Sequence, residues 1–224
     1  MFDWENRQVA DIREYFDNYA QDWNRNYQRQ ESFRERLAVF RESVRRALEN
    51  RSIGSVLEVG CGSFSMFEPA GRADIDYFAC DFSFEMLMHN QTGRNLFQAD
   101  FMKMPVREAF DMLILSSVVE WLPDPELTPG LTAQMVRQGG VLLVSYPNGQ
   151  SITRFFERYC LSPIKRALHK EHYTALQKTV NYTRMQNLFT SHGFKLVNVV
   201  FFGKKIVIRG RYSSSLRLDT YIKI

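Results

Sequence analysis

The stretch that decides the fold is Val56-Leu57-Glu58-Val59-Gly60-Cys61-Gly62-Ser63-Phe64-Ser65. An apolar run that contains one acidic residue is followed by two glycines one residue apart and then by a polar helix start. This order predicts a buried parallel strand that enters a tight turn and then a helix. Glycine at these two positions lets the turn form without Cβ clashes and lets a ligand approach the main chain closely. The stretch therefore predicts a cradle for a cofactor.

Length and composition set limits on the rest of the chain. With 224 residues, 45% of them hydrophobic, the chain can bury one large core, and a single α/β domain with appendages is expected. The sequence has no run of about 18 apolar residues and no signal-peptide pattern at its start, which predicts a soluble, cytoplasmic protein without a membrane span. The three cysteines, Cys61, Cys80 and Cys160, favour free thiols over disulfides, and no metal site is expected.

Positive charge is concentrated in two segments, although the whole chain carries a formal charge of only +4. Residues 151–184 contain seven Lys or Arg and two Glu, and residues 203–224 contain six Lys or Arg and one Asp. Such a basic rim favours an anionic substrate or a weak contact with phosphate-bearing material. The alternative is that these charges only solvate helix faces and edge strands.

Residues 1–50 have the pattern of two amphipathic helices, because apolar side chains recur at spacings of three and four. The first helix carries an aromatic face that includes Tyr15, Tyr19 and Trp23. These rings can pack on a core, cover a bound ligand, or do both.

After the glycine turn, four more apolar segments alternate with helical or loop patterns. Strands are expected at 55–59, 76–81, 95–99, 110–115 and 141–145, and a helix at 126–138. Asp81 ends the second strand, and Asp100 follows the third. Strands that alternate with helices predict a parallel sheet that binds ligands at the carboxyl ends of its strands.

Taken in order, these landmarks resemble the class I S-adenosylmethionine-dependent methyltransferases. The resemblance covers residues 53–202 and rests on Val-Leu-Glu-Val-Gly-Cys-Gly, the strand that ends in Asp81, Ala-Asp100-Phe101, Phe-Asp-Met-Leu-Ile-Leu-Ser-Ser-Val-Val-Glu-Trp-Leu and Gly-Gly-Val-Leu-Leu-Val-Ser. The opening Tyr-Phe-Asp-Asn-Tyr-Ala-Gln-Asp-Trp is similar to the leader helix of small-molecule members, such as those of ubiquinone and magnesium-protoporphyrin biosynthesis. The resemblance implies a Rossmann-like seven-stranded sheet, parallel except for an antiparallel final strand pair.

The resemblance also implies roles for single residues around S-adenosylmethionine and its product S-adenosylhomocysteine. Asp81 would bind the ribose hydroxyls, and Asp100 the adenine amino group, because carboxylates accept hydrogen bonds. The further residues of the implied cofactor site are Glu58 near the ammonium group, Gly60, Cys61 and Gly62 under the methionine, Phe82 and Phe101 at the adenine, and Ser116 behind strand four. Phe64 departs from the family, where many members have a third glycine, so either the loop takes a different path or this ring turns away and packs on the sheet.

The segment 151–180 interrupts the fold after strand five, and its helical pattern predicts a lid over the acceptor. The expected organisation is a helical cap at 1–50, a core at 51–150 and 181–210, this lid, and a tail or edge strand at 211–224. Within the last part of the core, 194–202 and 204–209 are expected to form the antiparallel pair. Besides the aromatic face of the first helix, the expected substrate and lid residues are Glu120, Trp121, Phe155, Tyr159 and Tyr173.

Methyl transfer from a sulfonium requires an aligned acceptor and, for a hydroxyl acceptor, a base. His169 and His172 in the lid are the first candidates for this base, with Tyr146, Glu120 and Tyr173 as further candidates. We therefore expect an enzyme that methylates a hydroxyl, or an amine, of a small and anionic biosynthetic acceptor, as a monomer or homodimer.

Two other functions compete with this expectation. The basic segments favour a nucleic-acid methyltransferase, but Ser-Ser-Val-Val-Glu-Trp after strand four differs from the Asp/Asn-Pro-Pro-Tyr/Phe pattern of enzymes that methylate base amines. No RNA-binding domain flanks the core either, so a nucleic-acid partner is disfavoured. The second competitor is a non-catalytic binding protein that retains the fold.

Overall fold

The computed structural model describes residues 4–27, 29–67, 74–91, 94–106, 110–148, 151, 177–178, 180–208 and 211–224. The strands in these ranges are β1 (Ser55–Val59), β2 (Asp76–Asp81), β3 (Leu96–Gln98), β4 (Phe110–Ser116), β5 (Val136–Pro147), β6 (Phe194–Ile208) and β7 (Arg211–Lys223). The α-helices are α1 (Trp4–Tyr27), α2 (Glu31–Asn50), α3 (Phe84–Met88), α4 (Thr128–Met135) and α7 (Tyr182–Ser191). Short 3-10 helices are η1 (Phe101–Lys103), η2 (Val119–Trp121) and η3 (Pro125–Leu127).

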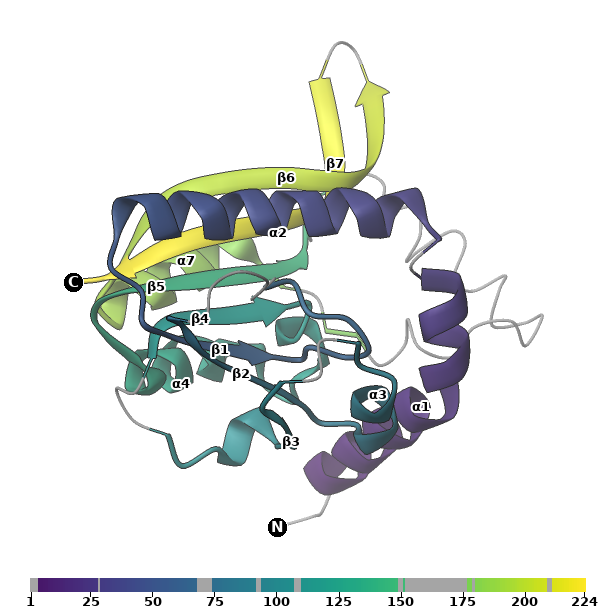
Figure 1. Cartoon of the computed structure of the whole chain (residues 1–224). Helices are drawn as coiled ribbons and strands as arrows, with labels where there is room; N and C mark the ends of the chain where they lie inside the picture. Colours follow the sequence, from purple (N-terminus) through teal and green to yellow (C-terminus); the bar gives the residue numbers. More distant parts are fainter. Residues whose placement is uncertain are drawn as a thin grey trace.

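The strands form one seven-stranded sheet in the order β3-β2-β1-β4-β5-β7-β6 (Figure 1). Strand β1 pairs in parallel with β2 and with β4, and β4 pairs in parallel with β5. Strand β7 runs antiparallel to both of its neighbours. The sheet confirms the expected Rossmann-like fold with an antiparallel final pair, and its parallel strands carry their carboxyl ends to one edge.

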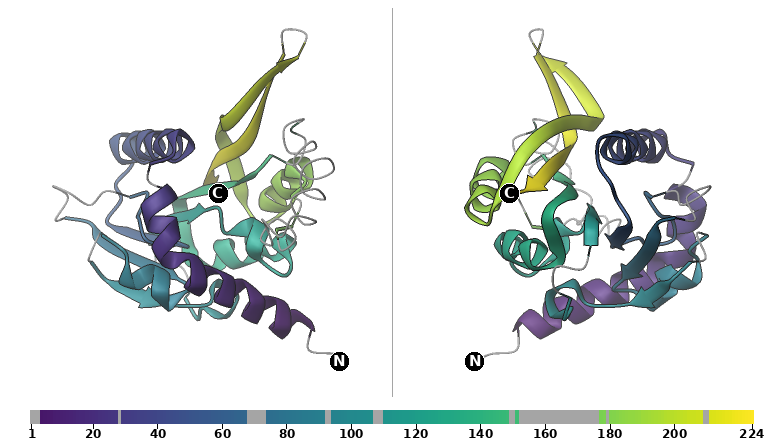
Figure 2. Two further views of the ribbon diagram at one scale, coloured as in Figure 1. Left: turned by 90° about the vertical axis from the view of Figure 1, so that its right-hand side faces the viewer. Right: turned by 60° about the vertical axis from the view of Figure 1, so that its left-hand side comes forward.

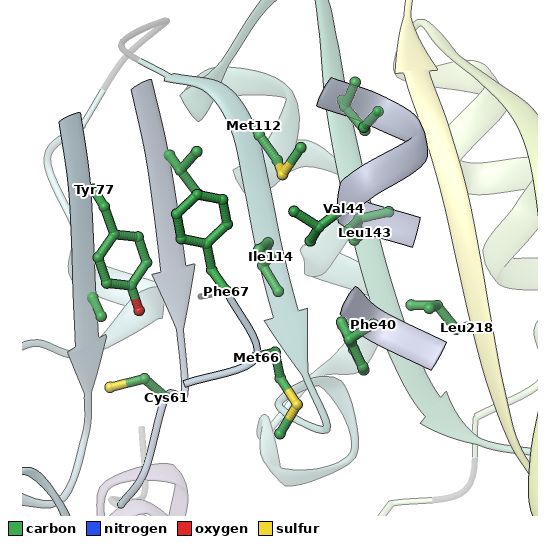
Figure 3. Close-up of a cluster of buried hydrophobic side chains, with 14 of the residues drawn as sticks. Phe40, Val44, Cys61, Met66, Phe67, Tyr77, Met112, Ile114, Leu143 and Leu218 are labelled. Carbon is green, nitrogen blue, oxygen red and sulfur yellow. The ribbon is translucent and has the colours of Figure 1, made fainter. Parts of the chain in front are cut away.

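Helices cover both faces of the sheet, as the views in Figure 2 show. On one face, Phe40 and Val44 of α2 belong to the same buried cluster as Ile114, Leu143 and Leu218 (Figure 3). The buried apolar positions of α2 are spaced seven, four and three residues apart, which gives the helix one apolar stripe. This helix was expected to be part of a cap, but it is a layer of the core.

The opposite face of the sheet is covered by α4 and α7. Met135 of α4 and Met185 and Phe189 of α7 are buried in one cluster with Leu113 and Leu142 of the sheet. The two clusters alternate along each strand because successive side chains point to opposite faces.

Strand β6 is longer than expected. Residues 194–202 and 204–209 were expected to be two strands that pair with each other, but β6 runs through both. Gly203, with φ +83°, lies at a register shift between Phe202 and Lys205 and forms a bulge instead of a turn. Figure 1 shows the β6–β7 ribbon extending past the rest of the sheet.

The last strand also differs from the expectation. Residues 211–224 were expected to be a tail or an edge strand, whereas β7 is an interior strand that pairs with β5 on one side and β6 on the other. A glycine suits both the expected turn at Gly203 and the bulge found there. The sequence therefore does not reveal that β6 continues past Gly203 and that β7 is its partner.

Helix α4 and strand β5 meet earlier than expected. The helix ends at Met135, and β5 already begins at Val136, which pairs with Phe110. The strand continues through Gly139 and Gly140, with a register shift opposite Phe110 and Met112. Pairing with β4 thus extends the strand into residues with a helical pattern.

Helix α1 lies at the edge of the sheet where the parallel strands end (Figure 1). Its buried side chains include Ile12 and Ala20. Among the described helices, none is both long and apolar enough to cross a membrane.

Candidate functional site

A cavity of about 610 Å³ lies where β1, β2 and β4 end. This volume is within the usual range of small-molecule sites. Residues from the loops after these strands line it, together with residues from α1 and the first turns of α2. The sequence predicted a ligand site at this edge, and the structure has a cavity there.

The glycine turn lines one part of the cavity. The N–H groups of Gly60 and Cys61 donate to the carbonyl oxygen of Cys80 at 2.8 and 3.1 Å, which fixes the turn to the end of β2. Gly60 has φ +71°, and a Cβ atom there would lie 2.4 Å from Cγ2 of Val118. Gly62 has φ +52°, with no atom within 4 Å of such a Cβ. The first glycine is therefore required by packing, and the second leaves the main chain open.

Asp81 connects this turn to the end of β2. Its Oδ2 accepts from the N–H of Gly62 at 2.8 Å, and its Oδ1 accepts from the N–H of Ser83 at 2.9 Å. Burial raises the pKa of the Asp81 carboxyl above its ordinary value, although these hydrogen bonds oppose the shift. The carboxylate lines the cavity and can accept further hydrogen bonds from a ligand.

Asp100 lies in the loop after β3, at the start of η1. Its Oδ1 accepts from the N–H of Met102 at 3.0 Å and so caps this short helix. Phe101 is buried, and both residues line the cavity with Phe82. The structure thus brings together all the predicted cofactor residues except Glu58: Gly60, Cys61, Gly62, Asp81, Phe82, Asp100, Phe101 and Ser116.

Ser116 and Ser117 leave the end of β4 beside the glycine turn. Their hydroxyl oxygens are buried and have no hydrogen-bond partner in the described part of the chain. Ser117 has φ +58°, and its N–H donates to Oγ of Ser145 at 3.0 Å. A non-glycine residue in this conformation costs about 1–3 kcal/mol, and such residues cluster at functional sites.

Aromatic side chains line another part of the cavity. The ring centroid of Phe16 lies 4.9 Å from that of Trp121 and 6.0 Å from that of Trp23, in edge-to-face arrangements. We call Phe16, Trp23 and Trp121 the aromatic cluster. Tyr19 also lines the cavity, while Tyr15 is not among the lining residues and instead stacks on Tyr19 and Trp121. The aromatic face of α1 thus contributes Phe16, Tyr19 and Trp23 to the cavity wall.

Two contacts connect α1 to the loop after β2. The guanidinium carbon of Arg13 lies 4.3 Å from the ring centroid of Phe82, which is a cation–π contact. The hydroxyl of Ser83 donates to Oδ1 of Asp17. We call this pair of contacts the α1 latch; it joins the helix that carries Phe16 and Trp23 to the residues next to Asp81.

Glu58 does not line the described cavity. Its side chain is fully buried and accepts from the N–H of Met66 at 2.8 Å, the N–H of Phe67 at 3.2 Å, the hydroxyl of Tyr77 at 3.0 Å, and the hydroxyl of Ser65. Burial raises its pKa, against the effect of these hydrogen bonds. The carboxylate was expected near a methionine ammonium group, and in the structure its hydrogen bonds fix the segment after the glycine turn.

Tyr146, a predicted catalytic base, is also placed elsewhere. It is fully buried, and its hydroxyl donates to Oδ2 of Asp219 at 2.5 Å. Asp219 also accepts from Nε of Arg217 at 2.5 Å and from the hydroxyl of Tyr221 at 3.0 Å. Burial and the neighbouring Asp219 raise the pKa of Tyr146. Its hydroxyl joins β5 to β7, and the residue is not part of the described cavity lining.

Phe64, the departure from the family pattern, closes the turn through its N–H, which donates to the carbonyl oxygen of Cys61 at 3.2 Å. Its ring packs edge-on against Phe33 of α2, with centroids 5.4 Å apart, and lines the cavity. The sequence left open whether the loop takes a different path or the Phe64 ring turns away and packs on the sheet. In the structure the ring turns away from the loop and packs on α2.

The predicted lid residues His169, His172, Phe155, Tyr159 and Tyr173 lie outside the described residues. Glu120 and Trp121 are described, and both line the cavity. Glu120 is 2% exposed, and its carbonyl oxygen accepts from the N–H of Lys178 at 2.7 Å. In the part of the chain that the structure describes, no three His, Cys, Asp or Glu side chains gather as metal ligands would.

Sequence reasoning missed several residues of the cavity. Ser117 adjoins Ser116 and Asp22 adjoins Trp23, so position alone could have identified them. Arg36 and Phe33 lie on a helix that was expected only to pack, and no motif distinguishes them. Cys61 was predicted, and burial raises the pKa of its thiol well above the usual value, so it remains protonated at neutral pH.

Comparison with known proteins identifies the central part of the chain. Residues 57–144 match the family model described as a methyltransferase domain. No curated protein sequence matches the chain. The matched segment begins in β1 and ends in β5, so it contains the glycine turn, Asp81, Asp100 and the serines after β4.

Solved structures share the fold over almost the whole chain. A protein from Thermotoga maritima, described as a SAM-dependent methyltransferase and possible histamine N-methyltransferase, has 16% identity and a TM-score of 0.67, covering 95% of this chain and 100% of its own. Magnesium protoporphyrin IX methyltransferase from Synechocystis PCC 6803 with bound SAH has 15% identity and a TM-score of 0.68, covering 96% and 99%. A Haloferax volcanii complex of the Trm112 methyltransferase activator and a putative methyltransferase gives 12% identity, a TM-score of 0.64, and coverage of 95% and 97%. This chain therefore has the fold of class I S-adenosylmethionine-dependent methyltransferases, as the sequence indicated.

Proposed function

We propose that the protein is an S-adenosylmethionine-dependent methyltransferase that acts on the hydroxyl or amine of a small-molecule acceptor, since residues 57–144 match the model of a methyltransferase domain. The observation that carries the proposal is one cavity that joins the glycine turn to two carboxylates at the ends of neighbouring strands. S-adenosylmethionine would supply an electrophilic methyl group there. A biosynthetic, cytoplasmic role and a monomeric or dimeric state remain part of the proposal from the sequence.

The residues of the cavity suit the parts of this cofactor. Gly62 leaves the main chain accessible to the methionine portion, and Asp81 provides carboxylate oxygens for the two ribose hydroxyls. Phe82 and Phe101 provide apolar surface for the adenine, and Asp100 accepts from its amino group. These are proposed roles, consistent with the place of each side chain in the cavity.

The remaining walls would position the acceptor. The aromatic cluster and Tyr19 provide apolar area, and α1 would shield the acceptor from water at the end of the sheet. For a hydroxyl acceptor, His169 and His172 remain the proposed bases, and the segment 151–180, with Phe155, Tyr159 and Tyr173, remains the proposed lid.

Isothermal titration with S-adenosylhomocysteine tests the cofactor site. Asp81→Ala should weaken binding about 100-fold, because two hydrogen bonds to a charged group are worth about 3 kcal/mol. Asp76→Ala is the matched control, since Asp76 begins the same strand and is exposed. Equal affinity of the wild type and Asp81→Ala would refute the assignment, and absence of binding by the wild type would refute the function.

A further inference from the structure

Among the described residues, more acidic than basic side chains line the cavity. Its described lining includes four carboxylates, Asp22, Asp81, Asp100 and Glu120, and one guanidinium, Arg36. The proposed function assigns Asp81 and Asp100 to the nucleoside of the cofactor. The proposed function assigns neither Asp22 nor Glu120 to the cofactor, and together with Arg36 they give this described part of the lining a negative formal charge. An acceptor with a positive charge would complement this wall better than an anionic one.

Glu120 is the more buried of these two carboxylates. Its side chain is 2% exposed and lines the cavity from η2, directly after β4. The hydrogen bond from the N–H of Lys178 to its carbonyl oxygen, 2.7 Å long, fixes η2 to the chain that enters α7. Burial lowers the effective dielectric around this carboxylate and so strengthens its attraction for a cation in the cavity.

The aromatic cluster lies beside this carboxylate. Trp121 follows Glu120 in the chain, and its ring contacts Phe16, which in turn contacts Trp23 next to Asp22. Aromatic faces attract organic cations and provide apolar area for the carbon skeleton that bears them. Both acceptor-side carboxylates are therefore immediate sequence neighbours of a tryptophan of the cluster.

The serines after β4 are a second, independent indication of a polar ligand. The hydroxyl of Ser116 has no partner in the described part of the chain although the residue is 8% exposed, and the same holds for the buried hydroxyl oxygen of Ser117. Strand β4 pairs with β1, with Leu115 opposite Val59, so these hydroxyls lie next to the glycine turn. A serine oxygen can accept a hydrogen bond from an N–H group, as an amine requires.

From these observations we infer that the methyl acceptor is an amine on an aromatic or apolar skeleton, with Glu120 as the group that binds it and takes its proton. The inference rests on the proposed function. The incoming ammonium gives a proton to Glu120, and the freed nitrogen lone pair forms the new N–C bond. The C–S bond breaks at the same time, the sulfur keeps its electron pair, and S-adenosylhomocysteine leaves.

Binding of matched probes to the protein saturated with S-adenosylhomocysteine tests this inference. Phenethylamine, 2-phenylethanol and 3-phenylpropanoate present an ammonium, a hydroxyl and a carboxylate on the same aromatic ring, and their affinities can be compared by isothermal titration. Phenethylamine should bind at least about tenfold more tightly than either other probe, because only its ammonium group can form a buried charge pair with Glu120. Glu120→Gln should abolish most of this preference, and Glu120→Asp should retain part of it.

Glu85→Gln is the matched control, because Glu85 is an exposed carboxylate of α3 that does not line the cavity. Glu85→Gln should leave the preference for phenethylamine unchanged. Glu120→Gln, Glu120→Asp and Glu85→Gln should all bind S-adenosylhomocysteine as the wild type does. The inference would be overturned if phenethylamine did not bind, if 2-phenylethanol bound equally well, or if 3-phenylpropanoate bound more tightly. In each case, binding of S-adenosylhomocysteine would still support the proposed function. Failure of S-adenosylhomocysteine to bind would instead overturn the function itself.

Discussion

Single residues of the glycine turn have different physical tasks. Gly60 and Gly62 both have positive φ angles, but only a side chain at Gly60 would collide with Val118. Gly62 leaves space towards the cavity, where a ligand can meet its main chain. The first glycine is therefore needed for folding the turn, and the second for what the turn can contact.

Gly60→Ala should destabilise the protein more than Gly139→Ala. Both glycines have positive φ angles, +71° and +78°, so alanine at either position costs about 1–2 kcal/mol of backbone energy. Only Gly60→Ala adds the clash with Val118, worth about 1–3 kcal/mol more. Urea unfolding measures both losses.

Adding Val118→Ala to Gly60→Ala should restore part of the lost stability, because the clashing methyl group is removed. Equal losses in Gly60→Ala and Gly139→Ala would show that the contact with Val118 does not matter.

The sequence predicted the site better from its turns than from its strands. Strand tips and glycines identify positions near a ligand without knowledge of side-chain direction, and the residues predicted in this way line the cavity. Glu58 and Tyr146 lie within strands, where neighbouring residues point to opposite faces. Glu58 meets donors from residues 65–67 and from Tyr77, and Tyr146 meets Asp219, so each has partners that no local pattern reveals.

Among the elements, helix α1 links the two parts of the cavity. It contributes Phe16, Trp23 and Asp22 to the lining, while the α1 latch attaches it to the loop after Asp81. Ser83 contacts both the end of β2 and α1, because its N–H donates to Asp81 and its hydroxyl donates to Asp17. A change at the end of β2 can thus be transmitted to the helix through one residue.

Asp17→Ala should loosen α1. Removing one hydrogen bond to a charged group lowers the free energy of opening by about 1.5 kcal/mol, which corresponds to about tenfold faster amide exchange. Hydrogen–deuterium exchange over residues 10–23 measures the effect. Asp11→Ala, an exposed position of the same helix, should leave exchange unchanged; similar rates in both variants would show that the latch does not restrain α1.

Elements with local signals were predicted closely, and elements defined by distant pairing were not. Strands β1 and β2 have the predicted bounds, since short apolar runs flanked by polar or glycine residues define them. The extension of β5 to Val136 depends on Phe110, and the place of β7 depends on β5, about seventy residues away along the chain. Such pairings come from the whole sheet and not from the segment itself.

At the scale of the whole molecule, the opposite end of the sheet has its own carboxylate. Asp111, near the start of β4, accepts from the N–H groups of Gly54 and Ser55 at 3.0 and 2.9 Å, and pairs with Arg137 of β5 at 3.0 Å. Partial burial acts to raise the pKa of Asp111, but these hydrogen bonds outweigh it and lower the pKa below its usual value. Asp111 thus ties β1, β4 and β5 together at the edge remote from the cavity.

This arrangement predicts a pH-dependent contribution to stability. A carboxyl whose pKa is lower in the folded state stabilises the fold above its unfolded pKa, about 3.9, and this contribution is lost as the pH falls through the folded pKa. Asp111→Asn should therefore reduce the free energy of unfolding by about 2 kcal/mol at pH 7. The difference from the wild type should shrink as the pH is lowered towards 3.

Urea unfolding of both proteins across this pH range measures the difference. Asp76→Asn provides the control, since this exposed aspartate should change stability little at either pH. A difference at Asp111 that stays constant with pH would show that its charge is not what stabilises the sheet.

The interior place of β7 affects the order in which the chain can fold during synthesis. Residues 211–223 leave the ribosome after every other described strand, yet β6 pairs with no strand except β7. Until these residues emerge, β6 has no partner, and one edge of β5 remains open. Synthesis proceeds at about 5–20 residues per second, so these edges are exposed for seconds in each nascent chain. Unpaired edges of this kind bind other unfinished chains, so nascent copies on a crowded polysome are vulnerable to aggregation until the last strand arrives.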